Sequence, residues 1–150
     1  MSTAASVPSF GCTCARLRKL TRRLTRIYDA HLSAQAIKVT QYSLLANAAR
    51  GERTLSEFAI ELEMDRSTLS RNLAPLAAQG WVELSVGADS RSRCISVTAA
   101  GRRKLKATLP LWRKAQCEVE SLLGAASVGE LHRDIERTLA ALPVLSGKRP

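Results

Sequence analysis

The chain has 150 residues and a formal net charge of +10 at pH 7, with an isoelectric point near 10.2. Hydrophobic residues make up 45% of the sequence but aromatic residues only 4%, so the composition favours a helical core of aliphatic side chains over a β-sandwich. The excess of basic residues favours a polyanionic partner, and it favours nucleic acid over an acidic membrane surface. No apolar run approaches the roughly 18 residues of a membrane span. Residues 1–11 lack the features of a signal peptide, so we expect a flexible tail there and a cytoplasmic protein.

Residues 12–36 form the first predicted unit, a basic amphipathic helix that covers residues 16–32. Its apolar face holds Leu17, Leu20, Leu24, Ile27, Tyr28 and Leu32, and its basic residues are Arg16, Arg18, Lys19, Arg22, Arg23 and Arg26. The basic face is either a solvated surface opposite a packed stripe or a surface that reaches phosphates or lipid. An arginine-rich organelle presequence is a third interpretation, which the expected packing role of this helix disfavours.

A second helix is expected to begin after Thr40, with this residue as its N-cap and Gly51 just beyond its end. Tyr42, Leu45 and Ala49 share one side of it. Its role is therefore interpreted as structural.

Two short helices joined by about three residues follow, and this pattern predicts a helix-turn-helix. Thr54 and Glu57 have the spacing of a capping box, which starts the first of these helices near Leu55. Asp65 can cap the second helix, which begins at Arg66.

The second helix of this pair has a packing face and an open face. Its packing face holds Leu69, Leu73 and Leu76, and the opposite direction is occupied by Ser67, Arg71, Ala74 and Ala78. Small side chains around an arginine let a helix approach a DNA major groove closely and donate hydrogen bonds there.

A β-hairpin is predicted directly after this helix, which Gly80 ends. Residues 81–86 and 93–97 read as paired strands around a polar turn. Arg91 at the tip can reach a minor groove, where the negative potential is high, and Asp89 can orient its guanidinium. The alternative is a solvated turn whose charges have no partner.

The C-terminal part predicts two more helices. Thr98 caps a long helix that runs to about Leu123, and Pro110 is expected to bend it. A capping box at residues 127–130 is expected to start the last helix, whose apolar stripe is Leu131, Ile135, Leu139 and Leu142. These stripes exceed what one small winged domain can cover, so we expect a second copy of the chain to bury them.

Together the elements predict a mainly α fold with a small β-hairpin wing. A winged helix-turn-helix lobe over residues 37–98 is flanked by an N-terminal dimerisation helix over residues 12–36 and by C-terminal dimerisation helices over residues 99–143, with a tail at residues 144–150. This order resembles the MarR family of winged helix-turn-helix regulators. The matching residues are Asp65 to Arg71 followed by Leu76 and Gly80, and Asp89-Ser90-Arg91 running into Ile95-Ser96-Val97-Thr98 and Gly101. Pro75 within the second helix departs from the commonest pattern and removes one backbone hydrogen bond.

The resemblance implies a homodimeric repressor that binds a pseudo-palindromic operator in double-stranded DNA and releases it when a signal arrives. Carried over to this chain, it implies major-groove contacts from Ser67, Thr68, Ser70, Arg71 and Asn72, a minor-groove contact from Arg91 held by Asp89, and backbone contacts from Arg66 and Arg93.

The signal implied by the resemblance is a small aromatic or phenolic-acid-like ligand bound in a cleft. The residues for such a cleft are Tyr28, His31, Tyr42, Arg50 and Trp81. Each also has an ordinary structural interpretation, as a cation at a helix end or as an aromatic side chain in the core.

Oxidation is the alternative signal. The peroxide-sensing branch of the family has a reactive cysteine near the start of the first helix and a tyrosine fourteen residues later, and Cys14 with Tyr28 has this spacing. Cys117 lies where that branch places a resolving thiol on the other subunit. However, Val39 stands where the branch has its second tyrosine, and idle cysteines are the other interpretation.

Other classes of function have weaker support in the sequence. Four cysteines and two histidines provide neither a disulfide framework nor a metal site, and Cys12-Thr13-Cys14 alone is a weak metal motif. We find no phosphate-binding loop, catalytic triad or clustered carboxylates, so we expect neither an enzyme nor a cofactor. A basic membrane-surface or protein-interaction module remains the alternative from another class, but it leaves the wing unexplained.

Overall fold

The computed structural model describes residues 11–87 and 92–144, so the tails expected at residues 1–11 and 144–150 lie almost wholly outside the described residues. In chain order the elements are α1 (Thr13–Leu32), η1 (Ser33–Gln35), α2 (Val39–Ala48), β1 (Arg53–Thr54), α3 (Leu55–Glu61), α4 (Arg66–Ala78), β2 (Val82–Val86), β3 (Arg93–Val97), α5 (Ala99–Leu123) and α6 (Ala125–Ala141). The predicted fold class is confirmed.

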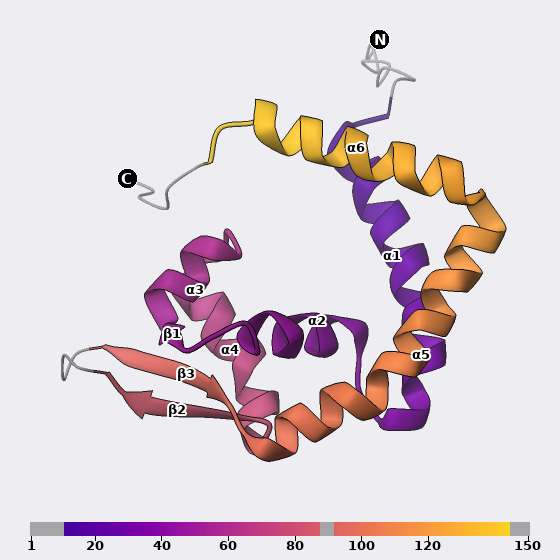
Figure 1. Ribbon diagram of the computed structural model, residues 1–150. Helices are drawn as coiled ribbons and strands as arrows, with labels where there is room; N and C mark the ends of the chain where they lie inside the picture. Colours follow the sequence, from indigo (N-terminus) through magenta and orange to yellow (C-terminus); the bar gives the residue numbers. More distant parts are fainter. Residues whose placement is uncertain (1–10, 88–91, 145–150) are drawn as a thin grey trace, which may run out of the picture.

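The molecule has two parts, which Figure 1 shows at an angle to each other. The lobe comprises α2 to β3, and the arm comprises α1, α5 and α6. Within the arm, α1 and α5 lie side by side, and α6 follows directly from the end of α5, which it contacts. The long helix α5 leaves the lobe and bends along its length, with Pro110 inside it. The helix α5 therefore belongs to the arm but contacts the lobe through α2 and β3.

The core of the lobe lies under α4. Leu69, Leu73 and Leu76 are each 0% exposed, as their shared helical face predicts. They pack in one cluster with Phe58 of α3 and Ile95 of β3, which are also fully buried. This packing fixes the rotation of α4 about its axis, and with it the side chains that α4 turns outward.

The wing is a three-stranded antiparallel sheet in the order β1-β3-β2. Leu84 of β2 lies opposite Ile95 of β3, and Arg53 of β1 lies opposite the same residue on the other side. The hairpin β2–β3 confirms the sequence prediction. The strand β1 was not expected, because two residues carry no periodic pattern.

The ends of α2 differ from the prediction. The helix begins at Val39 and not after Thr40, because the carboxylate of Asp29 in α1 accepts a hydrogen bond from the Val39 amide at 2.7 Å. It ends at Ala48, and Gly51 is not among the left-handed residues of the described chain. The Gln41 side chain also accepts from the Lys38 amide at 3.0 Å, so a local contact and a contact from another helix together set the start of α2.

The start of α6 also differs. The expected capping box at residues 127–130 does not form, because the helix begins at Ala125 and Ser127 lies inside it. The Val128 amide already donates to the Gly124 carbonyl at 3.1 Å. Gly124, with φ of +86°, turns the chain sharply enough for the first turn of α6 to follow α5 directly.

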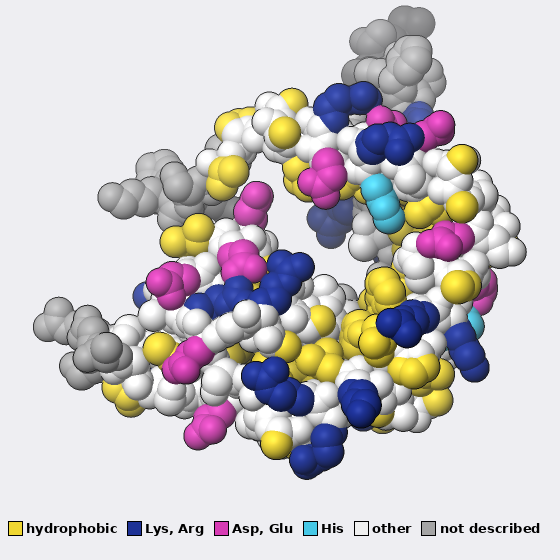
Figure 2. Space-filling view, in the orientation of Figure 1, with side chains coloured by type: hydrophobic (Ala, Val, Ile, Leu, Met, Phe, Trp, Pro, Cys, Tyr) yellow, Lys and Arg dark blue, Asp and Glu magenta, His cyan; other side chains and the backbone are white. Residues whose placement is uncertain are grey.

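Apolar side chains remain exposed on the arm. Of the ten large hydrophobic residues that are exposed among the described residues, seven lie on the arm or just beyond it: Leu17, Leu122, Leu123, Ile135, Leu139, Leu142 and Val144. In Figure 2, yellow side chains on α5 and α6 border an open space between the arm and the lobe. Within the described residues, no helix is both long and apolar enough to cross a membrane.

Candidate nucleic-acid interface

The outward face of α4 is formed by short polar side chains and two arginines. Among the residues predicted to contact DNA on this helix, Thr68 is half-buried and the others are exposed: Arg66, Ser67, Ser70, Arg71 and Asn72. The helix therefore presents hydrogen-bonding groups with little bulk, which suits insertion into a major groove.

A network of hydrogen bonds organises the first turn of α4. Asp65 caps the helix by accepting from the Thr68 amide at 2.7 Å. The same carboxylate accepts from the hydroxyl of Ser67 at 2.5 Å and from the hydroxyl of Thr68 at 2.7 Å. Arg71 donates in turn to the Thr68 hydroxyl oxygen at 3.3 Å. These bonds tie three residues of the predicted DNA-binding set to one carboxylate.

The strands of the wing are described up to the start of its turn, whereas residues 88–91 are not. Arg93 at the start of β3 is exposed, and the Gly87 amide donates to the Ser92 carbonyl at 2.9 Å to close the hairpin. Asp89 and Arg91, the residues predicted to reach the minor groove, lie outside the described residues.

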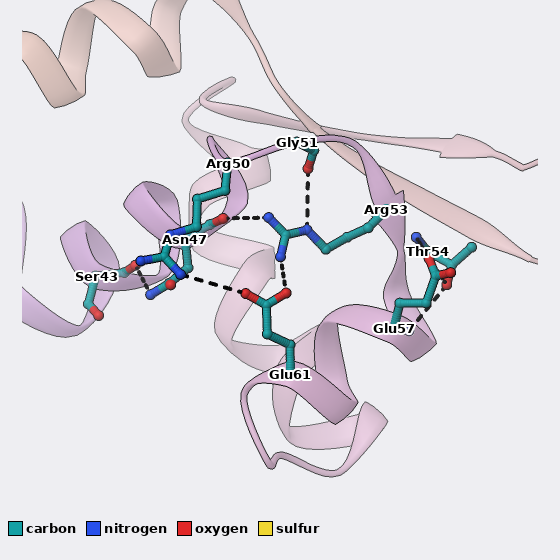
Figure 3. Close-up of polar contacts among 8 residues, drawn as sticks. All are labelled: Ser43, Asn47, Arg50, Gly51, Arg53, Thr54, Glu57 and Glu61. Atoms are coloured by element: carbon teal, nitrogen blue, oxygen red, sulfur yellow. Dashed lines mark hydrogen bonds and ion pairs between the residues drawn. The ribbon is translucent and has the colours of Figure 1, made fainter. Parts of the chain in front are cut away.

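Arg53 joins the wing to two helices of the lobe (Figure 3). Its guanidinium donates to the carbonyls of Asn47 at 2.8 Å and Gly51 at 3.3 Å, pairs with Glu61 at the end of α3, and lies 5.0 Å from the centre of the Phe58 ring. The Arg53 side chain is only 14% exposed. Periodicity did not identify this residue, because its partners come from three separate segments.

A cleft of about 440 Å³ lies between α1, α2 and α5. Three of the five residues predicted for a ligand line it, namely Tyr28, Tyr42 and Arg50. Trp112 completes its aromatic wall, with ring centres 6.4 Å from Tyr28 and 6.5 Å from Tyr42. Trp112 is not among the residues predicted for this cleft.

The other two predicted ligand residues lie elsewhere. His31 lies in the last turn of α1, where its Nε2 atom is 2.6 Å from the carboxylate of Glu118. Trp81 lines a separate cleft, where the ammonium group of Lys104 lies 4.9 Å from its ring. Neither of these residues lines the cleft of Tyr28 and Tyr42.

Comparison with known proteins agrees with this geometry. The sequence model of the MarR family matches residues 37–92. The chain is also 36% identical to the M. tuberculosis transcriptional regulator MosR solved in complex with DNA, over 87% of this chain and 96% of that chain, with a TM-score of 0.79. This chain belongs to the MarR family of transcriptional regulators.

More distant structures share the fold. A cysteine-to-serine mutant of E. coli MarR in complex with operator DNA is 23% identical, with a TM-score of 0.76 over 84% of this chain and 92% of that chain. The S. aureus MepR–DNA complex is 19% identical, with a TM-score of 0.73 over 88% of this chain and 99% of that chain. A search of curated proteins finds no match.

A second cleft of this MarR-family chain adjoins α4 itself. It has a volume of about 550 Å³ between α2 and α4, and its lining includes Leu44, Met64, Arg71, Asn72 and Pro75. No pattern in the sequence predicts this cleft. Because Arg71 and Asn72 also belong to the predicted DNA-binding set, any occupant of this cleft would compete with DNA for them.

The cysteines are all free thiols among the described residues. Cys14 and Cys117 are exposed, and Cys94 is partly buried. Cys14 lies fourteen residues before Tyr28 on α1, which corresponds to about 21 Å along the helix axis. Tyr28 itself donates to Gln116, the neighbour of Cys117. Within one chain the two thiols therefore lie far apart.

Asp65→Asn is predicted to lower the stability of the fold in a pH-dependent way. The bonds from Ser67 and Thr68 hold the pKa of the Asp65 carboxyl well below its usual range. A lowered folded-state pKa means that the carboxylate stabilises the fold above about pH 4, and that this contribution is lost as the pH falls through the folded-state pKa.

The wild type should therefore melt at a higher temperature than Asp65→Asn at pH 7, and the difference should shrink toward about pH 3. Thermal unfolding followed by circular dichroism measures it. A difference that stays constant over this range would contradict the role assigned to the charge.

Proposed function

We propose that this chain is a homodimeric, DNA-binding repressor that recognises a pseudo-palindromic operator and is released by a small aromatic acid. The observation that carries the proposal is the outward face of α4, where the exposed Ser67 and Arg71 lie opposite the buried Leu69, Leu73 and Leu76. The likeness to MosR in complex with DNA supports it.

In this proposal α4 enters the major groove and the wing reaches the neighbouring minor groove. Arg71 is placed for a bidentate contact to guanine, the commonest specific contact of an arginine. Arg66 and Arg93 are both exposed and serve in this proposal as phosphate contacts. The net charge of +10 supports strong attraction to DNA and a marked salt dependence of binding.

The exposed apolar stripe of the arm supports the homodimer. Ile135 is 37% exposed and Leu139 is 53% exposed on α6, where they follow one another at four-residue spacing. In a twofold dimer the same surface of each chain meets its counterpart, so the stripe of one arm can cover the stripe of the other. Two α4 helices would then address two half-sites of a palindrome.

Arg91→Ala is predicted to weaken operator binding by about tenfold or more, because it removes the minor-groove contact and one cationic group. Titration of a fluorescently labelled operator measures the loss. Arg133→Ala on α6 is a suitable control, since it removes an arginine far along the chain from the wing. Equal affinity of Arg91→Ala and the wild type would refute the role of the wing.

The cleft of Tyr28, Tyr42 and Trp112 is the proposed effector site. Burial raises the pKa of Tyr42, and burial followed by the charge of Glu120 raises the pKa of Tyr28, so both phenols stay neutral at physiological pH. The aromatic walls suit a planar ring. Arg50, which is 71% exposed at the rim, suits a carboxylate.

The effector site predicts that 4-hydroxybenzoate will alter the fluorescence of Trp112 and reduce operator binding. Arg50→Gln should weaken the effect of this probe about tenfold, because a neutral amide replaces the charge that pairs with the carboxylate. The neutral 4-hydroxybenzamide serves as a matched control. If the acid and the amide act alike on both proteins, Arg50 does not recognise the carboxylate. The fluorescence is measured in the Trp81→Phe background, where Trp112 is the single tryptophan of the chain.

Peroxide sensing through Cys14 and Cys117 is the second candidate signal, and the exposure of both thiols favours it. A hydroperoxide would oxidise the Cys14 thiolate to a sulfenic acid with release of an alcohol, and a thiol would then displace water to form a disulfide. The separation of the two residues within one chain requires Cys117 of the second copy. After hydroperoxide treatment, a linked dimer on a non-reducing gel would support this signal, whereas unlinked chains with intact DNA binding would exclude it.

A further inference from the structure

The first turn of α4 restricts how its hydroxyl groups can bind DNA. Ser67 is exposed on the outward face, yet its hydroxyl lies 2.5 Å from a carboxylate oxygen of Asp65. The hydrogen bonds that lower the pKa of Asp65 keep it ionised, so the carboxylate has no proton to give. The serine must therefore be the donor in this contact.

A serine hydroxyl has one proton and two acceptor lone pairs. Once the proton is directed to Asp65, only acceptor capacity remains on the outward side of Ser67. Phosphate oxygens are acceptors, and so are the guanine N7 and O6 and the thymine O4 atoms of the major groove. The major-groove donors are the amino groups of adenine N6 and cytosine N4.

We propose that Ser67 is a specificity-determining residue that accepts a hydrogen bond from the amino group of an adenine or a cytosine, because Asp65 holds its hydroxyl proton. The inference rests on the proposed DNA-binding function of α4 and names the base class that this helix reads. Thr68 does not share the role, since its hydroxyl oxygen also accepts from Arg71 and the residue is half-buried.

The position of that base follows from helix geometry. Ser67 and Arg71 are four residues apart on α4, so their Cβ atoms lie about 5–6 Å from each other on one face. Successive bases are about 3.4 Å apart along a strand. If Arg71 contacts guanine, the amino-bearing base lies within about two steps of that guanine, on the strand nearest Ser67.

The test begins with full-length wild-type protein and a library of random-sequence duplexes. The enriched duplex should carry guanine with adenine or cytosine within two steps of it in each half-site. Binding is then measured for this duplex and for a variant in which that adenine or cytosine is exchanged symmetrically for thymine or guanine.

Ser67→Ala should bind the enriched duplex about threefold to tenfold more weakly for each half-site, the range expected for one hydrogen bond. Its affinity for the exchanged duplex should equal that of the wild type. Ser56→Ala is the matched control: it removes an exposed hydroxyl from α3, outside the set predicted to contact DNA. It should leave the preference at this base pair unchanged.

Asp65→Ser provides a second variant, because a serine can still cap the Thr68 amide while it frees the proton of Ser67. Enrichment from the same library with this variant should also yield duplexes that carry thymine or guanine at this position. Thermal melting of each variant confirms that it is folded at the assay temperature.

Three outcomes overturn the inference. In the first, Ser67→Ala keeps the base preference of the wild type and weakens binding to all duplexes equally, which would indicate a phosphate contact. If the wild type itself enriches no sequence, the proposed function fails and the inference fails with it. If the wild type enriches a palindrome without the adenine or cytosine, the inference alone fails.

Discussion

Gly101→Ala is expected to destabilise the fold severely and to abolish DNA binding with it. A Cβ atom at position 101 would lie 2.1 Å from the carbonyl oxygen of Trp81 and 2.8 Å from a methyl group of Val97. The first of these neighbours is backbone, so the first turn of α5 must move away from the wing. That turn is also held by Thr98, whose hydroxyl donates to the Gly80 carbonyl at 2.6 Å and accepts from the Gly101 amide at 3.1 Å.

Overpacking of this kind costs about 1–3 kcal/mol, and the loss of the Thr98 contacts adds to it. Urea unfolding followed by circular dichroism measures the change in the free energy of unfolding. Gly51→Ala is the matched control, because a Cβ there meets nothing within 4 Å. If Gly101→Ala is as stable as Gly51→Ala, the close approach of α5 to Trp81 is not a constraint on the fold.

Leu139→Glu is expected to convert the protein to a monomer and to lower its affinity for a palindromic duplex about a hundredfold or more. Leu139 is 53% exposed in the isolated chain, so a carboxylate is tolerated there in the monomer. In a dimer that buries the α6 stripe, the same carboxylate would be desolvated without a partner. Each monomer would then hold only one half-site, and the benefit of two linked contacts would be lost.

Light scattering after size-exclusion chromatography measures the mass, which should fall from about twice the chain mass of 16.3 kDa to the chain mass itself. Arg133→Glu also places a carboxylate on α6 but two residues from Leu131 and from Ile135, on the other side of the helix. It should leave the mass unchanged. A dimeric Leu139→Glu would show that this stripe is not the interface.

The elements of the lobe could be predicted because their signals are local. Thr54 does accept from the Glu57 amide, Asp65 does cap α4, and Thr98 does accept from the Gly101 amide. Each of these contacts spans three residues, so a sequence shows both partners at once. Gly80, with φ of +69°, likewise occupies the left-handed position that ends α4.

Features that depend on distant partners were missed or misplaced. The start of α2 is decided in part by Asp29, ten residues away on another helix. The position of His31 is decided by Glu118, and sequence spacing does not reveal such a pair. Trp112 shows a further limit, since its periodic position is the same whether a helix faces a packed core or the wall of a cleft.

Arg53 has a mechanical consequence for how the protein can respond to a signal. Its guanidinium fastens the end of α2, the strand β1 and the helix α3 to one another, with little exposure to water. Moving α2, β1 or α3 relative to one another would break several of these bonds at once, so these three elements resist separate movement. A signal that displaces α2 is therefore expected to carry β1 and α3 with it.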